Sequence, residues 1–136
     1  MKLSKKGEYA LRALSCLVRR RGAGPVPIRE IAQEEQIPKK FLEAILLELR
    51  KAGLIESSRG AGGGYRLVKD PAGISLARVI RLIDGPLAPL RCVSRTAPIR
   101  CPRERICGLY GVMAEVREAV AGILEKKNLG DLASRS

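Results

Sequence analysis

Three of the four cysteines fall within a short stretch rich in arginine and proline. Cys92, Cys101 and Cys107 follow a C-x8-C-x5-C spacing, and thiolates are preferred ligands of soft metal centres. The spacing differs from the paired CxxC of zinc ribbons and from a ferredoxin run. Nearby guanidinium groups would stabilise thiolates and offset the negative charge of a thiolate-bound cluster. These arginines are Arg95, Arg100, Arg103 and Arg105. The stretch is therefore a candidate metal-binding loop.

Three thiolates leave one coordination position open, and the chain has no histidine to fill it. Cys16, a carboxylate or an exogenous small ligand are the candidates for the fourth position. The alternative for the loop is three unligated thiols, or a disulfide, in a mobile segment. Cys16 lies in or beside an apolar helix face, which favours a small buried residue over a ligand. Without histidine, a nucleophile elbow, an HExxH motif or a Walker motif, the sequence argues against an enzyme.

The charge balance points to a polyanionic partner. The 136 residues carry 26 Lys and Arg against 14 Asp and Glu, a net charge of +12, with 18 basic and 9 acidic residues before Cys92. Such a field attracts nucleic acid first and an anionic membrane surface second. Aromatic residues make up only 3% of the chain, which weakens RNA or single-strand binding by base stacking. Since no membrane span or signal peptide is evident, we expect a cytoplasmic protein with reduced thiols.

The elements that would carry these groups begin with a predicted helix-turn-helix. Apolar spacing predicts a first helix from a Ser4 cap to the arginines at 19–21, and a short second helix over 28–35. A third helix is expected from Pro38 to a terminating Gly53. Two short helices joined by about three residues form a helix-turn-helix, whose second helix enters the major groove.

A wing and two further helices complete the predicted fold. Residues 54–57 and 65–68 flank a glycine-rich turn and predict a hairpin, and Ser75 caps a fourth helix. After the cysteine loop, an apolar stripe about five turns long predicts a helix that pairs with a second copy. The polar tail after Asn128 is expected to fray. The stripe consists of Ile106, Leu109, Tyr110, Met113, Val116, Val120, Ile123 and Leu124.

The fold class is therefore mainly α, a winged helix-turn-helix DNA-binding domain with a long C-terminal dimerisation helix. We assign residues 1–85 to the DNA-binding domain, 86–107 to the cysteine-rich cluster-binding loop and 108–136 to the dimerisation helix and polar tail.

Candidate DNA contacts lie on the third helix and the wing. Lys39, Lys40 and Glu43 occupy the exposed N-terminal end of the helix. Glu43 can accept a hydrogen bond from the amine of cytosine, or it forms an ordinary surface ion pair. Arg59 can enter a minor groove, and the glycines from Gly60 onward would let the backbone approach DNA. The alternative is a flexible turn with an exposed arginine. The RGAGGG segment lacks the GKS/T ending of a phosphate-binding loop.

Several segments together resemble the Rrf2 family of bacterial winged-helix regulators, which includes IscR, NsrR and RirA. The resemblance covers roughly residues 1–125, and the RGxGGGYxL wing followed by three cysteines is highly specific. It implies a homodimeric transcription factor, a repressor of a palindromic operator, with a 2Fe-2S or 4Fe-4S cluster. DNA affinity would change when the cluster is lost, oxidised or nitrosylated. The matching segments are KKGEYALRAL, IREIAQEEQIPKKFLEAILLELRKAGLI, SSRGAGGGYRLVKDP and ISLARVIRLIDG.

The resemblance also implies residue roles. The three loop cysteines would ligate the cluster, and the DNA contacts would be Lys40, Phe41, Glu43 and Arg59. Two features depart from IscR: the first cysteine interval is longer, and Tyr110 replaces the ligand histidine. Other members use an acidic residue near the start of the first helix, reaching across the dimer, and Glu8 stands at that place. Its alternative role is an early-helix carboxylate favoured by the helix dipole.

Two other functions remain open from the sequence. One is a cluster-free regulator of the same fold that senses redox state through its thiols. The other is a basic interaction module for RNA or membrane surfaces.

Overall fold

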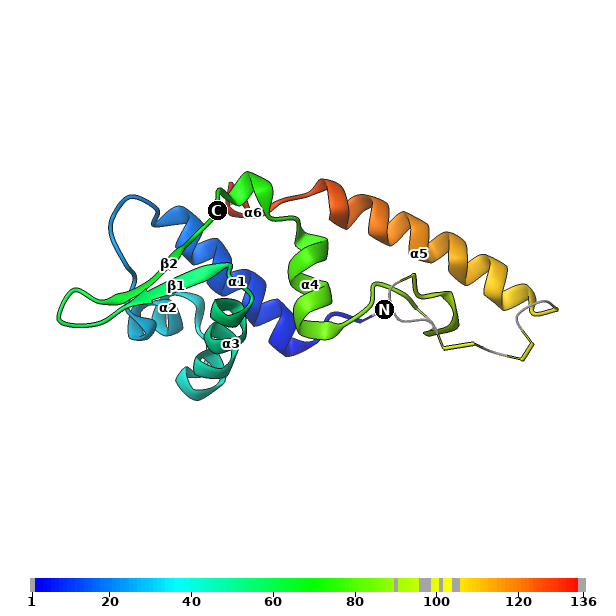
Figure 1. The fold of residues 1–136 in the computed structure, drawn as a ribbon, viewed down its shortest axis with the longest axis horizontal. Helices are drawn as coiled ribbons and strands as arrows, with labels where there is room; N and C mark the ends of the chain where they lie inside the picture. The colour runs from blue at the N-terminus through cyan, green and yellow to red at the C-terminus, as the bar shows by residue number, and fades with distance from the viewer. Residues whose placement is uncertain (1, 90, 96–98, 101, 104–105, 135–136) are drawn as a thin grey trace.

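The computed structural model describes residues 2–89, 91–95, 99–100, 102–103 and 106–134. The molecule is elongated, with the winged-helix part at one end and a long helix reaching away from it (Figure 1). Most element boundaries lie within about two residues of the expected ones. The elements in order are α1 Lys5–Arg19, α2 Ile28–Glu35, α3 Lys39–Lys51, β1 Ile55–Ser58, β2 Gly64–Leu67, η1 Pro71–Gly73, α4 Leu76–Asp84, η2 Arg91–Val93, α5 Gly108–Lys126 and α6 Leu129–Ala133.

Local signals set the ends of the helix-turn-helix. The Ser4 hydroxyl accepts a hydrogen bond from the Gly7 N–H at 2.9 Å and caps α1. α2 ends where Gln36 adopts a left-handed conformation, with φ of 54°, and Gly53 ends α3 in the same region, with φ of 78°. The core between α1, α2, α3, α4 and α6 is built on fully buried side chains. These are Leu14, Leu17, Ile31, Leu42, Ile45, Leu46, Leu49, Leu54, Ile55, Ile74, Val79 and Leu129.

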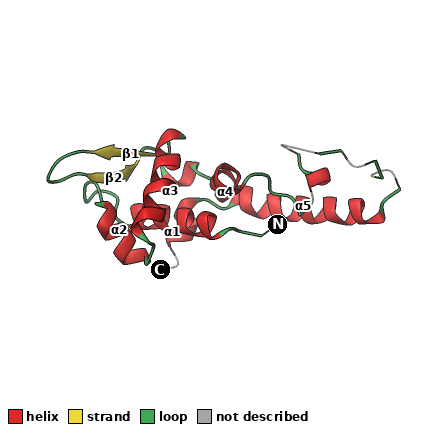
Figure 2. Cartoon of the chain, turned by 90° about the horizontal axis from the view of Figure 1, so that it is seen from below, coloured by secondary structure: helices red, strands yellow, loops and turns green. Residues whose placement is uncertain are grey.

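The wing is an antiparallel hairpin that is also tied to the start of α2. Ile55 pairs with Leu67 across β1 and β2, and the hairpin projects from the end of the molecule opposite the far tip of α5 (Figure 2). Val26, just before α2, forms an isolated bridge with Tyr65, with both N–O distances at 2.8 Å. The wing therefore leaves the helix-turn-helix along a fixed direction.

The last glycine of the wing turn is sterically required. Gly64 has φ of 156°, and a Cβ there would stand 2.3 Å from the Val26 carbonyl carbon. We expect Gly64→Ala to break both Val26–Tyr65 hydrogen bonds and to lower the free energy of unfolding by about 2 kcal/mol. Urea unfolding measures the change. Gly62→Ala is the matched control, because a Cβ there meets nothing within 4 Å. Equal stability of the two variants would contradict the steric requirement.

The expectation that the tail after Asn128 frays is wrong, because residues 129–133 form α6 and pack against α1. Asn128 and Asp131 form a reciprocal capping box, with distances of 3.0 and 2.9 Å between side-chain oxygen and backbone nitrogen. Leu129 is fully buried in the core. A helix of this length would be unstable alone, and α6 is stabilised by its cap and by packing against the core.

The C-terminal end of α5 is fastened to the segment that leads into α4. The Leu76 N–H donates to the Lys127 carbonyl at 2.9 Å, and the Leu129 N–H donates to the Ile74 carbonyl at 3.1 Å. Beyond this base, α5 packs against α4 and η2.

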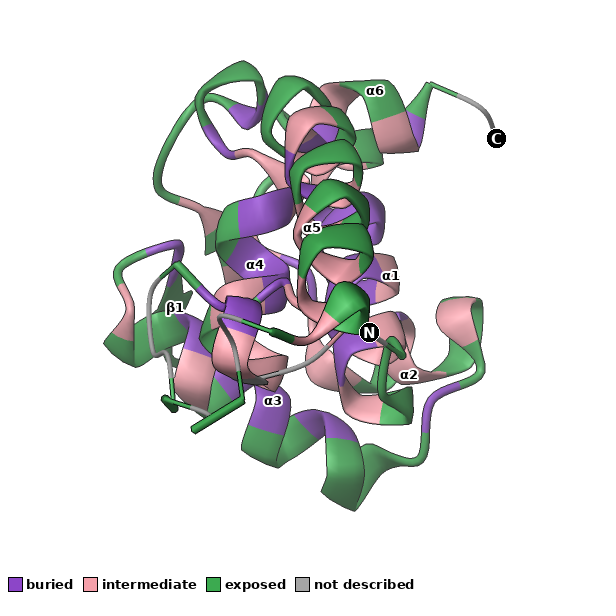
Figure 3. Cartoon of the chain, turned by 90° about the vertical axis from the view of Figure 1, so that its right-hand side faces the viewer, coloured by how far each residue is buried: buried purple, intermediate pink, exposed green. Residues whose placement is uncertain are grey.

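One side of α5 is left exposed (Figure 3). The expected apolar stripe divides into two faces. Met113, Val120 and Leu124 are half-buried, whereas the outer face is open to solvent. That face carries Leu109, Val112, Val116 and Ile123, which are 39–61% exposed. No helix in the described part of the chain has the length and apolar character needed to cross a membrane.

Candidate nucleic-acid interface and cysteine loop

The N-terminal end of α3 presents a charged surface. Lys39, Lys40 and Glu43 are exposed, whereas Leu42 and Ile45 face the core. Among the described residues, Glu43 forms no ion pair. Its carboxylate is thus available as an acceptor for a base edge.

Phe41 joins this surface to α1. Phe41 is 40% exposed, and its ring meets that of Tyr9 edge to face, with centroids 5.5 Å apart and an interplanar angle of 82°. Lys5 and Arg12 lie over the Tyr9 ring at 5.5 and 5.4 Å. Phe41 is therefore partly a packing residue that fixes α1 against the start of α3. No local sequence pattern indicated the contact between Tyr9 and Phe41.

Arg59 and Gly60 lie in the exposed turn between β1 and β2. Gly60 has φ of 98°, and a Cβ there would meet nothing within 4 Å. Nearer the base, Arg66 pairs with Glu56 across the strands. In the part of the wing that the structure describes, Arg59 has no such carboxylate partner.

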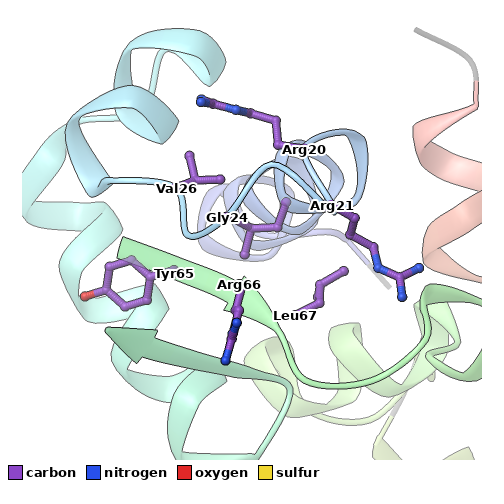
Figure 4. Close-up of a pocket in the computed structure, with 9 residues that line it drawn as sticks. Arg20, Arg21, Gly24, Val26, Tyr65, Arg66 and Leu67 are labelled. Atoms are coloured by element: carbon purple, nitrogen blue, oxygen red, sulfur yellow. The ribbon is translucent and has the colours of Figure 1, made fainter. Parts of the chain in front are cut away.

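A hollow of about 350 Å³ lies between the connection from α1 to α2 and the wing. Figure 4 shows Arg20 and Arg21 at the end of α1 and Arg66 on β2 around it. Arg20 is held by Glu30 at 2.7 Å. These arginines extend the cationic surface along the wing base.

The structure describes two of the three cysteines of the loop, and they lie at its two ends. Cys92 lies in η2 and Cys107 occupies the N-cap position of α5, and both are free, half-buried thiols. Cys101, the remaining expected ligand, lies outside the described residues. Within the described ranges, the one group of three ligating side chains with donor atoms within 4.8 Å of one another is Cys16, Glu34 and Glu35. Cys92 and Cys107 alone do not make a complete ligand set.

The arginines of the loop are placed differently from each other. Arg95 pairs with Glu118 on α5, so its charge is partly engaged away from the thiols. Arg100 and Arg103 are exposed. Arg105 lies outside the described residues.

Glu8 lies on the surface of α1. Its carboxylate pairs with Lys5 at 3.5 Å and with Arg12 at 3.6 Å, and it is 43% exposed. It borders a mainly apolar hollow of about 290 Å³ that also involves Leu11 and Leu132. In the described part of the chain, no ion pair or hydrogen bond joins Glu8 to the cysteine loop of its own subunit.

Cys16 is completely buried. Its thiol donates to Glu34, with Sγ and Oε2 2.6 Å apart, and Arg19 pairs with both Glu34 and Glu35. Burial first, and then the hydrogen bond to Glu34, raises the pKa of Cys16 to about 12. Sequence reasoning missed the two glutamates because they come from α2.

Cys16 is expected to keep its proton and resist alkylation in the folded protein. The unfolded thiol ionises near 9.0 and the folded one near 12, so the unfolded state loses the proton first as pH rises. The contribution of the Cys16 thiol to the free energy of unfolding is therefore fully present below the unfolded pKa. Above that pKa it declines by up to about 1.4 kcal/mol per pH unit. Cys16→Ala should flatten the alkaline decline in the free energy of unfolding. Identical pH slopes in the two proteins would refute this.

A helix-turn-helix followed by a hairpin, with a basic exposed surface on both, defines a winged-helix DNA-binding protein. The relationship to known proteins is consistent with that class. The chain belongs to the Rrf2 family, whose model, described as an iron-dependent transcriptional regulator, matches residues 3–135. It is thus an Rrf2-family transcriptional regulator, and the relatives found are transcriptional regulators, not enzymes.

Curated relatives align over nearly the whole chain. An rrf2-like HTH-type transcriptional regulator of Rhodobacter capsulatus is 42% identical, covering 96% of this chain and 91% of the relative. CymR of Bacillus subtilis is 36% identical, covering 98% and 91%. IscR of Escherichia coli is 33% identical, covering 98% and 81%.

Solved structures confirm the fold. CymR, described as the global cysteine regulator of B. subtilis, matches with a TM-score of 0.83 at 33% identity, covering 100% of this chain and 98% of that one. The oxidized form of Staphylococcus aureus CymR matches with a TM-score of 0.76 at 32% identity, covering 98% and 96%. The predicted family and the mainly α, winged-helix fold class are both correct.

Proposed function

We propose that this regulator is a homodimeric repressor whose affinity for a palindromic operator is controlled by an iron–sulfur cluster. Cluster status would report iron supply, nitric oxide or redox state. The observation that carries the proposal is the position of the three-cysteine loop between α4, the end of the DNA-binding domain, and α5. A cluster bound to this loop could therefore change the position of both α4 and α5.

The donors support a thiolate-bound cluster. Cys92 and Cys107 are free and half-buried, and iron–sulfur clusters are held mainly by cysteine thiolates. Cys92, Cys101 and Cys107 would be the three cysteine ligands. When bound, the cluster would supply a link between these thiolates that oxidation or nitric oxide can break.

Glu8 is proposed as the fourth ligand, supplied by the second subunit. Its carboxylate is half-exposed and makes no described contact with the loop of its own chain, which is consistent with a role across a dimer. Its pairs with Lys5 and Arg12 are surface ion pairs, which are weak. They would be given up on ligation at small cost.

The apolar outer face of α5 supports the homodimer. Leu109, Val112, Val116 and Ile123 are exposed at helical spacing, and an identical helix would bury them. A two-fold dimer places two α3 helices against half-sites about 34 Å apart. Each copy would contact DNA through Lys39, Lys40, Phe41, Glu43, Arg59 and Gly60.

The test is anaerobic purification followed by iron and sulfide analysis, visible absorption and native mass spectrometry. We expect a brown protein whose absorption is lost in Cys92→Ser and Cys107→Ser, with Cys16→Ala as the thiol control that retains it. A colourless wild type free of iron and sulfide would overturn the cluster. In Glu8→Ala, absorption and cluster lifetime equal to wild type would exclude Glu8 as a ligand.

A second candidate function is thiol-based redox sensing without a cluster. It is favoured by the similarity to B. subtilis CymR, described as a global cysteine regulator, and to S. aureus CymR, which has been solved in an oxidized form. Metal-free protein in which oxidation of loop thiols changes DNA affinity would support this alternative. Titration of free thiols by mass spectrometry, before and after peroxide, makes the distinction.

A further inference from the structure

The first part of the cysteine loop is fastened to α5 by side chains of that helix. Arg117 donates through Nη1 to the backbone carbonyl of Val93, the residue directly after Cys92. Arg117 also contacts Glu118 at 2.9 Å, and the Glu118 carboxylate accepts a second guanidinium, from Arg95. Arg117 and Glu118, which are adjacent on α5, thus bind the two residues that flank Ser94.

Packing supports this attachment. Val93 and Ser94 are 0% and 5% exposed, and Leu87 earlier in the loop is 4% exposed. The hollow lined by Leu87, Arg95, Arg117 and Ala121, with Arg81 of α4, has a volume of only about 10 Å³. The segment is therefore packed against the helix, in contrast to the exposed residues at 99–100 and 102–103.

The charges favour the same arrangement. Desolvation opposes ionisation of Glu118, but hydrogen bonds from Arg117 and Arg95 outweigh it and lower the pKa of that carboxyl. A planar guanidinium can donate to a carbonyl and a carboxylate at once, which an ammonium group does less well.

We propose that Arg117 and Glu118 are positioning residues that hold Cys92 in place on α5 before any metal binds. The hydrogen bond to the Val93 carbonyl holds the Val93–Ser94 peptide unit, and this restrains the backbone next to Cys92 and the direction from which its thiol can be offered. Cys107 begins the same helix, about 15 Å from Arg117 along the axis, so both ligands take their positions from one rigid element. The consequence for metal binding rests on the proposed iron–sulfur function, whereas the positioning of Cys92 does not.

The test measures alkylation of Cys92 and Cys107 separately, by peptide mass spectrometry on reduced, metal-free protein. In Arg117→Met, which keeps the aliphatic stem, we expect Cys92 to react about 5-fold to 10-fold faster. Loss of a charge-assisted hydrogen bond would raise by about this factor the fraction of molecules in which the segment around Cys92 is detached from α5. Cys107 should react at the wild-type rate. Acceleration at Cys92 with an unchanged rate at Cys107 therefore reports displacement of the segment that Arg117 holds.

Three further variants make the result specific. Arg117→Lys should restore part of the wild-type rate, and Glu118→Gln should accelerate Cys92 by about 2-fold to 3-fold. Glu125→Gln is the matched control, because Glu125 also accepts from an arginine, Arg81 at 2.7 Å, but has no hydrogen bond or ion pair with the described part of the loop. It should leave both rates unchanged.

An unchanged Cys92 rate in Arg117→Met with a wild-type melting temperature would overturn the proposal. Equal acceleration of Cys92 and Cys107 with a lowered melting temperature would also overturn it, because that is general loosening. If Arg117→Met does not fold, Glu118→Gln decides. A wild-type protein that binds no cluster would refute the proposed function. The alkylation rates of Cys92 and Cys107 would still test the positioning of Cys92, because they are measured on metal-free protein. If the cluster forms, its lifetime in Arg117→Met should be about 5-fold shorter.

Discussion

Replacing Val116 by aspartate is expected to make the protein monomeric and to lower its affinity for a palindromic duplex by about 1000-fold. Val116 lies in the middle of the outer apolar face of α5 and is 39% exposed in the single chain. In a paired helix, an added carboxylate would lose its water without gaining a partner. A monomer contacts only one half-site, so most of the specific binding is lost.

Analytical ultracentrifugation and a duplex-binding titration at fixed salt measure this effect. Gly111→Asp is the matched control, because it adds a carboxylate on the polar side of α5 where a Cβ meets nothing within 4 Å. It should remain dimeric and bind normally. A Val116→Asp protein that is still dimeric would show that the outer face of α5 is not the interface.

Arg59→Ala is expected to weaken binding by roughly 10-fold to 100-fold, as loss of one well-placed arginine contact does. Arg59 is exposed at the wing turn, and a guanidinium is attracted by the negative potential of a narrow minor groove. The logarithmic salt dependence of binding should also become shallower by about one unit. A duplex selected from a random pool serves as the operator, with affinity measured at several salt concentrations.

Arg66→Ala is the wing control, because Arg66 is also exposed but is engaged by Glu56 on β1. Its effect on affinity should be clearly smaller. If Arg59→Ala and Arg66→Ala reduce affinity equally, the wing acts only as a diffuse positive charge. Thermal melts of both variants should give the wild-type melting temperature, which checks that neither substitution unfolds the protein.

Local signals were enough to predict the helix-turn-helix and the wing. Ser4 and Ser75 cap their helices as expected, at 2.9 and 3.1 Å to the backbone nitrogen, because capping depends on residues three positions apart. Gly53 likewise ends α3 with a positive φ. Helix caps and terminating glycines depend on residues within about one helical turn of each other, so they can be predicted from the sequence alone.

Contacts between distant segments could not be predicted in the same way. The Val26–Tyr65 bridge and the hydrogen bond at 2.9 Å from the Ser4 N–H to Asp84 join residues far apart in sequence. The Arg117 contact with Val93 likewise spans the whole loop. Val112 was missed because the apolar stripe was treated as one face, whereas packing against α4 divides α5 into an inner and an outer side.

The backbone hydrogen bonds at residues 127 and 129 make α5 a lever whose fulcrum lies at its C-terminal end, beside the start of α4. Nineteen residues of helix extend about 28 Å from this fulcrum to the cysteine end. A displacement of about 2.5 Å at Cys107 would therefore tilt the arm by about 5° at its base. A small change at the loop would thus reach α4, against which α5 packs, as a rotation of one rigid helix, with no need for unfolding.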